Sequence, residues 1–213
     1  MSAVELDQVS KSFGVVRAVD DVSFNVAGGE IFGLLGPNGA GKTTILRLIL
    51  DIFKPDHGQI AVLDGTINEA KKARIGYMPE ERGLYQDVPL ERCLVYLASL
   101  KGLPKSEAKS RVSDYLERFD LISYRKKPVK ELSKGMQQKA QIIVTLVHDP
   151  ELLIVDEPFN GLDPVNTKMV KDILSDLREN GVAIIMSTHQ MHQVEELCDR
   201  ILLIDHGRTL LHG

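Results

Sequence analysis

The sequence lacks the paired cysteines of disulfide-rich extracellular proteins and the net positive charge of nucleic-acid-binding proteins. Its 213 residues include two cysteines, no tryptophan and only 5% aromatic residues. Cys93 and Cys198 have neither the spacing of a disulfide framework nor that of a zinc motif, which favours a reducing compartment. The formal net charge of −4 provides no basic field. We therefore expect no nucleic-acid partner.

Long apolar runs are also absent. No run approaches the roughly 20 residues that cross a bilayer, and the N-terminal residues do not have the pattern of a secretory signal. We expect a cytoplasmic protein that does not enter a membrane by itself. The basic residues between 125 and 130 are interpreted as a solvated loop rather than a binding patch.

The order of apolar and polar residues predicts one domain of the α/β class. The first sixty residues alternate with period two, as expected for β-strands with one buried face. Residues 84–134 change to helical periodicity, and apolar strands alternate with helices from about residue 134 onward. Strands that are continuously apolar indicate a mostly parallel sheet covered on both faces. We expect one domain over residues 1–213, with a helical subdomain at about 84–134.

A complete phosphate-binding loop follows the apolar stretch 30–35 and precedes a helical stretch at 44–50. It consists of Gly36, Pro37, Asn38, Gly39, Ala40, Gly41, Lys42 and Thr43. A strand that passes through such a turn into a helix directs backbone N–H groups and a helix dipole at one point. Lys42 is predicted to reach the terminal phosphates, Thr43 to bind Mg²⁺, and Thr44 to add a backbone amide. A glycine-rich turn without function does not explain the strand, the spacing, the lysine and the threonine together.

Two acids end a second apolar strand at 152–155. Asp156 is placed to hold Mg²⁺, and Glu157 is placed to orient or deprotonate an attacking water. Strands often end in solvated acids, so the functional interpretation depends on the neighbouring phosphate loop.

The segment 132–138, Leu-Ser-Lys-Gly-Met-Gln-Gln, precedes that strand by one helix. It resembles the Leu-Ser-Gly-Gly-Gln signature of ATP-binding-cassette (ABC) ATPases, with Lys134 and Met136 as departures. In that family the signature faces the γ-phosphate of ATP held by a partner subunit, and the resemblance implies this role for Ser133 and Gly135. Ser133 also fits a plain helix N-cap.

Further elements of the family occur in the expected order. Phe13 occupies the position of the aromatic residue that stacks on adenine, although a lone Phe is more often a core residue. His189 matches the histidine that contacts the γ-phosphate. Asp163 belongs to a segment resembling a dimer-contacting loop, and it also fits a helix N-cap. His189 and His192 lack the further ligands of a zinc site.

Glu80 replaces the glutamine that the family carries after the strand at 74–78. We expect its carboxylate to join the metal shell, and the alternative is a role in coupling to the membrane partner. The surrounding segment 76–85 is similar to cassettes of sodium-efflux and drug-efflux exporters.

The resemblance covers essentially the whole chain and implies a fold, a reaction and partners. The fold is a phosphate-loop core with an antiparallel N-terminal region and a helical signature subdomain. The reaction is Mg²⁺-dependent ATP hydrolysis. It is catalysed by a head-to-tail pair of ATPase subunits, identical or paralogous, that sandwich two ATPs. The subunits dock peripherally on an integral-membrane permease, in an exporter. DNA-repair and translation cassettes need a coiled coil or tandem domains, and a phosphate-loop kinase leaves the signature and His189 unexplained.

Overall fold

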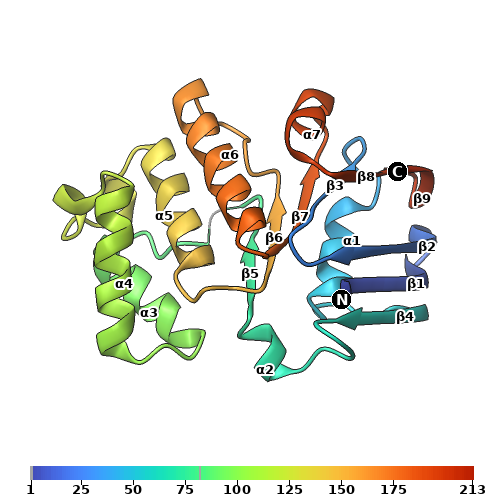
Figure 1. Cartoon of the computed structure of the whole chain (residues 1–213), viewed down its shortest axis with the longest axis horizontal. Helices are drawn as coiled ribbons and strands as arrows, with labels where there is room; N and C mark the ends of the chain where they lie inside the picture. Colours follow the sequence, from blue (N-terminus) through green and yellow to red (C-terminus); the bar gives the residue numbers. More distant parts are fainter. Residues whose placement is uncertain (1, 82) are drawn as a thin grey trace.

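The computed structural model describes residues 2–81 and 83–213 in two sheets and a group of helices (Figure 1). Met1 and Arg82 lie outside the described residues, and Arg82 belongs to the exporter-like segment 76–85. The strands are β1 Ser2–Phe13, β2 Val16–Ala27, β3 Ile31–Leu35, β4 His57–Val62, β5 Ile75–Met78, β6 Leu152–Asp156, β7 Ala183–Thr188, β8 Arg200–Asp205 and β9 Arg208–His212. The α-helices are α1 Lys42–Ile49, α2 Glu69–Lys72, α3 Leu90–Leu100, α4 Lys105–Arg118, α5 Lys134–Leu146, α6 Pro164–Glu179 and α7 Met191–Leu197.

The larger sheet has the strand order β5-β6-β7-β3-β8-β9 and is parallel except for the hairpin that adds β9. Strands β3, β6 and β7 are buried at every residue. Their residues are apolar up to the carboxyl ends of β6 and β7, because both faces of the sheet are covered. The smaller sheet, β2-β1-β4, is antiparallel throughout.

Successive residues of the central strands enter two separate cores. Leu152 and Ile154 pack with helix α1 and the antiparallel sheet, whereas Leu153 and Val155 pack with the helices on the other face. This alternation follows from the period-two geometry of a strand. Figure 1 shows α3, α4 and α5 gathered beyond the β5 edge, opposite the antiparallel strands.

The predicted α/β class, with a mostly parallel sheet and an antiparallel N-terminal region, is confirmed. The structure differs in detail at the ends of helices. Helix α1 covers Lys42–Ile49 rather than the expected 44–50. The short helix α2 has no counterpart among the predicted elements, because a single turn shows no periodicity. In the part of the chain that the structure describes, no helix is long and apolar enough to cross a membrane.

Candidate active site

The loop between β3 and α1 brings its backbone close to neighbouring segments. Gly41 lies at φ 109°, directly before the first helical residue, Lys42. A Cβ on Gly41 would lie 2.4 Å from the carbonyl oxygen of Ala18, and one on Gly36 would lie 2.2 Å from that of Ile204. Only glycine fits at these two positions. The first residues of α1 line the adjoining cavity, and the N–H groups that the first turn of a helix leaves without helical partners suit an anion there.

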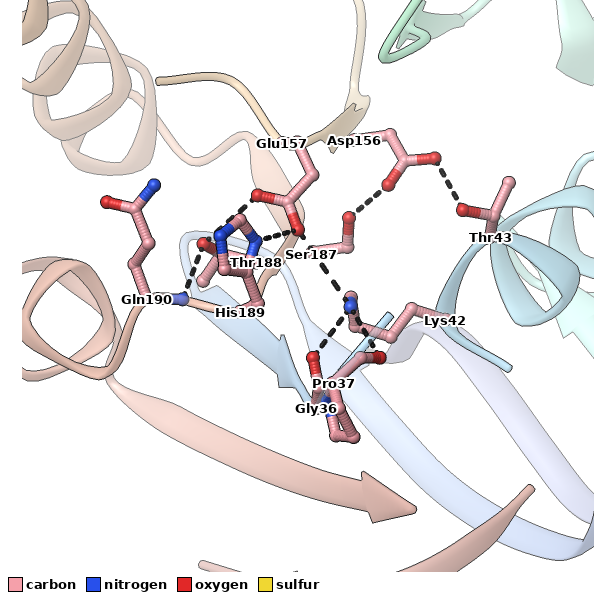
Figure 2. A network of polar contacts seen from close by, with 10 residues as sticks. All are labelled: Gly36, Pro37, Lys42, Thr43, Asp156, Glu157, Ser187, Thr188, His189 and Gln190. Carbon is pink, nitrogen blue, oxygen red and sulfur yellow. Dashed lines mark hydrogen bonds and ion pairs between the residues drawn. The ribbon is translucent and has the colours of Figure 1, made fainter. Parts of the chain in front are cut away.

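Lys42 is buried, and the loop itself holds its amine. Nζ donates hydrogen bonds to the carbonyl oxygens of Gly36 (2.7 Å) and Pro37 (3.2 Å), and it lies 3.8 Å from Oε1 of Glu157 (Figure 2). The side chains of Lys42 and Glu157 are each 7% exposed. A buried ammonium group requires such partners, and this one points to the end of the sheet where the acids lie.

Asp156 ends strand β6 and joins two hydroxyl groups. Its Oδ2 accepts a hydrogen bond from Oγ1 of Thr43 at 3.0 Å, and its Oδ1 accepts one from Oγ of Ser187 on the neighbouring strand β7. Carboxylate and hydroxyl oxygens are the ligands that Mg²⁺ prefers. The position at the carboxyl ends of parallel strands is where α/β sheets bind ligands.

Glu157 has a strained backbone and a fixed side chain. Its φ is +50°, which is rare for a residue other than glycine. Its N–H donates to the carbonyl oxygen of Ser187 at 3.1 Å. Oε1 lies 2.8 Å from Nδ1 of His189, and the Thr188 hydroxyl donates to Oε2 at 3.4 Å. The carboxylate is therefore held between Lys42 and His189, as Figure 2 shows.

Lys42, Asp156 and Glu157 border a cavity of about 410 Å³, of the size that holds a small-molecule ligand, whereas His189 does not line it. Glu80 lines it together with Thr43, Asp156 and Glu157. The phosphate-loop residues that line it are Asn38, Gly39, Ala40, Gly41, Lys42, Thr43 and Thr44. Gly36 and Pro37 contribute the carbonyl groups that hold Lys42. A larger groove of about 610 Å³ lies at the amino-terminal ends of β5, β6 and β7, away from these groups.

One wall of the cavity is formed by residues that belong to none of the predicted motifs. Val16, Arg17 and Ala18 line it from the start of β2, and His206 and Gly207 line it from the β8–β9 turn. Gly207 is held there because its N–H donates to the carbonyl oxygen of Ala40, and its own carbonyl accepts from Asp20. These residues form no local motif, so only tertiary structure shows that they share the site.

Phe13, Ser133 and Gly135 do not line this cavity, although all three are predicted nucleotide contacts. Phe13 is 43% exposed and packs edge-on against Phe53, with ring centroids 5.1 Å apart. The Ser133 hydroxyl caps α5 by accepting a hydrogen bond from the N–H of Met136 at 3.2 Å. Gly135 lies near the side chain of Asn166 on α6.

Asp163 forms the predicted helix N-cap on α6. Its carboxylate accepts the N–H of Asn166 at 2.9 Å. The backbone and side-chain hydrogen bonds from Asn166 lower the pKa of Asp163. Because Gly135 lies near the side chain of Asn166, helix α6 begins next to the start of α5, where the signature-like turn lies.

The donor set fits a nucleotide phosphate chain with Mg²⁺. Backbone N–H groups and one lysine suit an anion, and the oxygens of Thr43 and Asp156 suit a hard cation. A Cβ at Gly41 would clash with the carbonyl oxygen of Ala18, so a side chain there would displace the loop that forms the anion-binding part of the site.

Comparison with known proteins decides the family. Residues 19–160 match the family model described as ABC transporter. The "Uncharacterized ABC transporter ATP-binding protein YhaQ" of Bacillus subtilis is 46% identical over 208 residues, which are 98% of this chain and 70% of the relative. The chain belongs to the ABC transporter ATP-binding family.

Other relatives of this ATP-binding subunit extend the comparison. The "Nod factor export ATP-binding protein I" of Paraburkholderia xenovorans is 39% identical over 215 residues, 100% of this chain and 71% of that protein. A solved structure titled "Structure of ATP binding subunit of ABC transporter" superposes with a TM-score of 0.91 at 31% identity, covering 99% of this chain and 89% of the other. The expected family and fold are confirmed, and the roles of individual site residues remain predictions.

Proposed function

We propose that this ATP-binding subunit hydrolyses ATP to ADP and phosphate, with Glu157 as the base that activates water. The observation that carries this proposal is the fixed position of Glu157. Its carboxylate lies 3.8 Å from Nζ of Lys42 and 2.8 Å from Nδ1 of His189, at the border of the phosphate-loop cavity. A general base needs both a defined orientation and access to the reacting water.

The residues of the loop bind the nucleotide in this proposal. The amides of residues 39–44 and the Lys42 ammonium hold the phosphates. Thr43, Asp156 and Glu80 hold Mg²⁺, which when bound neutralises charge that builds up on the phosphate oxygens. His189 contacts through Nδ1 the same carboxylate oxygen of Glu157 that faces Lys42, orients that carboxylate, and senses the γ-phosphate.

A second copy, or a paralogous subunit, completes each site. Ser133 and Gly135 lie outside the cavity of their own chain, which supports a role toward a partner's nucleotide. A head-to-tail pair places the start of α5 of one subunit against the phosphate loop of the other, so that two ATPs are sandwiched. Phe13, at 43% exposure, remains available to stack on adenine once the nucleotide is bound.

The assembly drives an integral-membrane subunit and exports its substrate. The relative from Paraburkholderia is named for Nod factor export, and this supports the direction. Residues 1–213 act as one nucleotide-binding domain, with a helical subdomain over about 84–134. The subunit sits at the inner face of the membrane and is held there by its partner.

Glu157→Gln tests the proposal because the amide keeps the shape of the side chain but cannot accept the proton. We expect normal affinity for Mg-ATP, loss of turnover, and accumulation of an ATP-bound dimer on size-exclusion chromatography. Hydrolysis at the wild-type rate would show that Glu157 is not the base. Loss of ATP binding would show that its role is structural.

A further inference from the structure

Helix α5 carries two buried glutamines that the reaction proposed above does not use. Gln138 is 7% exposed and Gln141 is 5% exposed. Their amide groups face the protein interior, where an unpaired polar group is costly. Each of them contacts a segment that carries an acid of the candidate active site.

Gln138 lies between the segment that follows Glu157 and the strand that precedes Glu80. Its Nε2 donates a hydrogen bond to the carbonyl oxygen of Pro158, the residue after Glu157, at 3.3 Å. The same nitrogen lies 3.8 Å from the sulfur of Met78, the last residue of β5. Two residues further along the chain is Glu80.

Gln141 contacts the chain on the other side of Glu80, after the acid. Its Oε1 accepts a hydrogen bond from the N–H of Gly83 at 3.2 Å. We call the described residues 79–81 and 83 the Glu80 segment. Strand β5 ends directly before this segment, Gln141 accepts the N–H of its last residue, and Glu80 lines the cavity.

We propose that Gln141 is a positioning residue that sets the distance of the Glu80 carboxylate from Thr43 and Asp156. The inference rests on the metal-shell role of Glu80 in the proposed function. Ser133 caps the same helix, so α5 connects the signature-like turn to the Glu80 segment through Gln141. Gln138 contributes by holding the peptide that follows Glu157.

A matched pair of variants separates positioning from simple structural support. Gln141→Met keeps the length of the side chain and removes the acceptor for Gly83. Thr145→Val is the control: Thr145 is 3% exposed on the same helix, and among the described residues its hydroxyl donates to the carbonyl oxygen of Gln141. Gln141→Glu restores an acceptor for Gly83.

The first readout is amide hydrogen exchange at Gly83 in the nucleotide-free protein. We expect exchange to quicken several-fold in Gln141→Met and to stay near the parent rate in Thr145→Val and Gln141→Glu. Equal exchange in Gln141→Met and the parent would overturn the inference.

The second readout is calorimetric affinity for ATP, with and without Mg²⁺, in the non-hydrolysing Glu157→Gln background. We expect Gln141→Met to reduce the gain in affinity that Mg²⁺ provides by roughly fivefold, the factor that corresponds to one ordinary hydrogen bond. Affinity without Mg²⁺ should not change. If Mg²⁺ increases the ATP affinity of the parent and of Gln141→Met by the same factor, this inference is wrong and the metal assignment stands. A parent that ignores Mg²⁺ would overturn the metal assignment and the inference together.

Discussion

His148 makes the stability of the subunit sensitive to acid, and the structure allows the effect to be estimated. The residue follows α5, and its Nε2 lies 3.2 Å from the carbonyl oxygen of Ile75 at the start of β5. Its Nδ1 is buried without a hydrogen-bond partner among the residues that the structure describes. Burial, with a smaller contribution from the charge of Lys101, lowers the pKa of His148 from 6.5 to about 4.

The sign follows from proton binding in the two states. Above pH 6.5 neither the folded nor the unfolded chain protonates this residue, so it adds no pH dependence. Between pH 6.5 and 4 the unfolded chain binds a proton that the folded chain does not. The free energy of unfolding therefore decreases as the pH is lowered through this range. A difference of about 2.5 in pKa corresponds to at most about 3 kcal/mol, of which about 2 kcal/mol is lost between pH 7 and pH 5.

Urea unfolding of the wild type and of His148→Gln at pH 7 and pH 5 measures this loss. Glutamine does not titrate, and its amide can replace the contact with Ile75. We expect the wild type to lose about 2 kcal/mol more than the variant between the two pH values. Parallel losses would refute the argument, because they would mean that His148 protonates equally easily in both states.

Two further predictions concern the nucleotide site. Lys42→Ala removes a buried ammonium and, with it, charge-assisted hydrogen bonds to phosphate, so titration with Mg-ATP should show affinity lower by roughly 100-fold or more; unchanged affinity would refute the assignment of the loop. Glu80→Gln should change the Mg²⁺ concentration required for half-maximal ATPase activity of the isolated subunit, because Glu80 lines the same cavity as Thr43 and Asp156. An unshifted Mg²⁺ dependence, with transport lost only in the complex with the membrane subunit, would favour the coupling role instead.

Local patterns in the sequence predicted the parts of the site that local geometry determines. The strand, loop and helix around Lys42 and the strand that ends at Asp156 are each one short segment. Both strands were predicted to be buried and parallel, so their carboxyl ends had to meet at one edge of the sheet. The predicted N-caps at Ser133 and Asp163 are also local, and both have the expected hydrogen bonds.

The other parts of the cavity depend on contacts between distant segments. Arg17 and His206 are 189 positions apart, and they share a wall because the start of β2 and the β8–β9 turn pack against the phosphate loop. The link between Gln141 and Gly83 joins residues 58 positions apart. Gly83 lies in the exporter-like segment 76–85, but no local pattern pairs it with Gln141, so their contact is determined by packing.

Specific ATPase activity as a function of protein concentration tests the composite dimeric site most directly. The measurement should span the dilution range over which size-exclusion chromatography shows the dimer dissociating. If Ser133 and Gly135 complete the site of another subunit, activity per subunit must fall on dilution as mass action separates the pair, and Ser133→Arg should abolish hydrolysis while sparing ATP binding. Activity per subunit that stays constant across that range would contradict the account, because each chain would then hydrolyse ATP by itself.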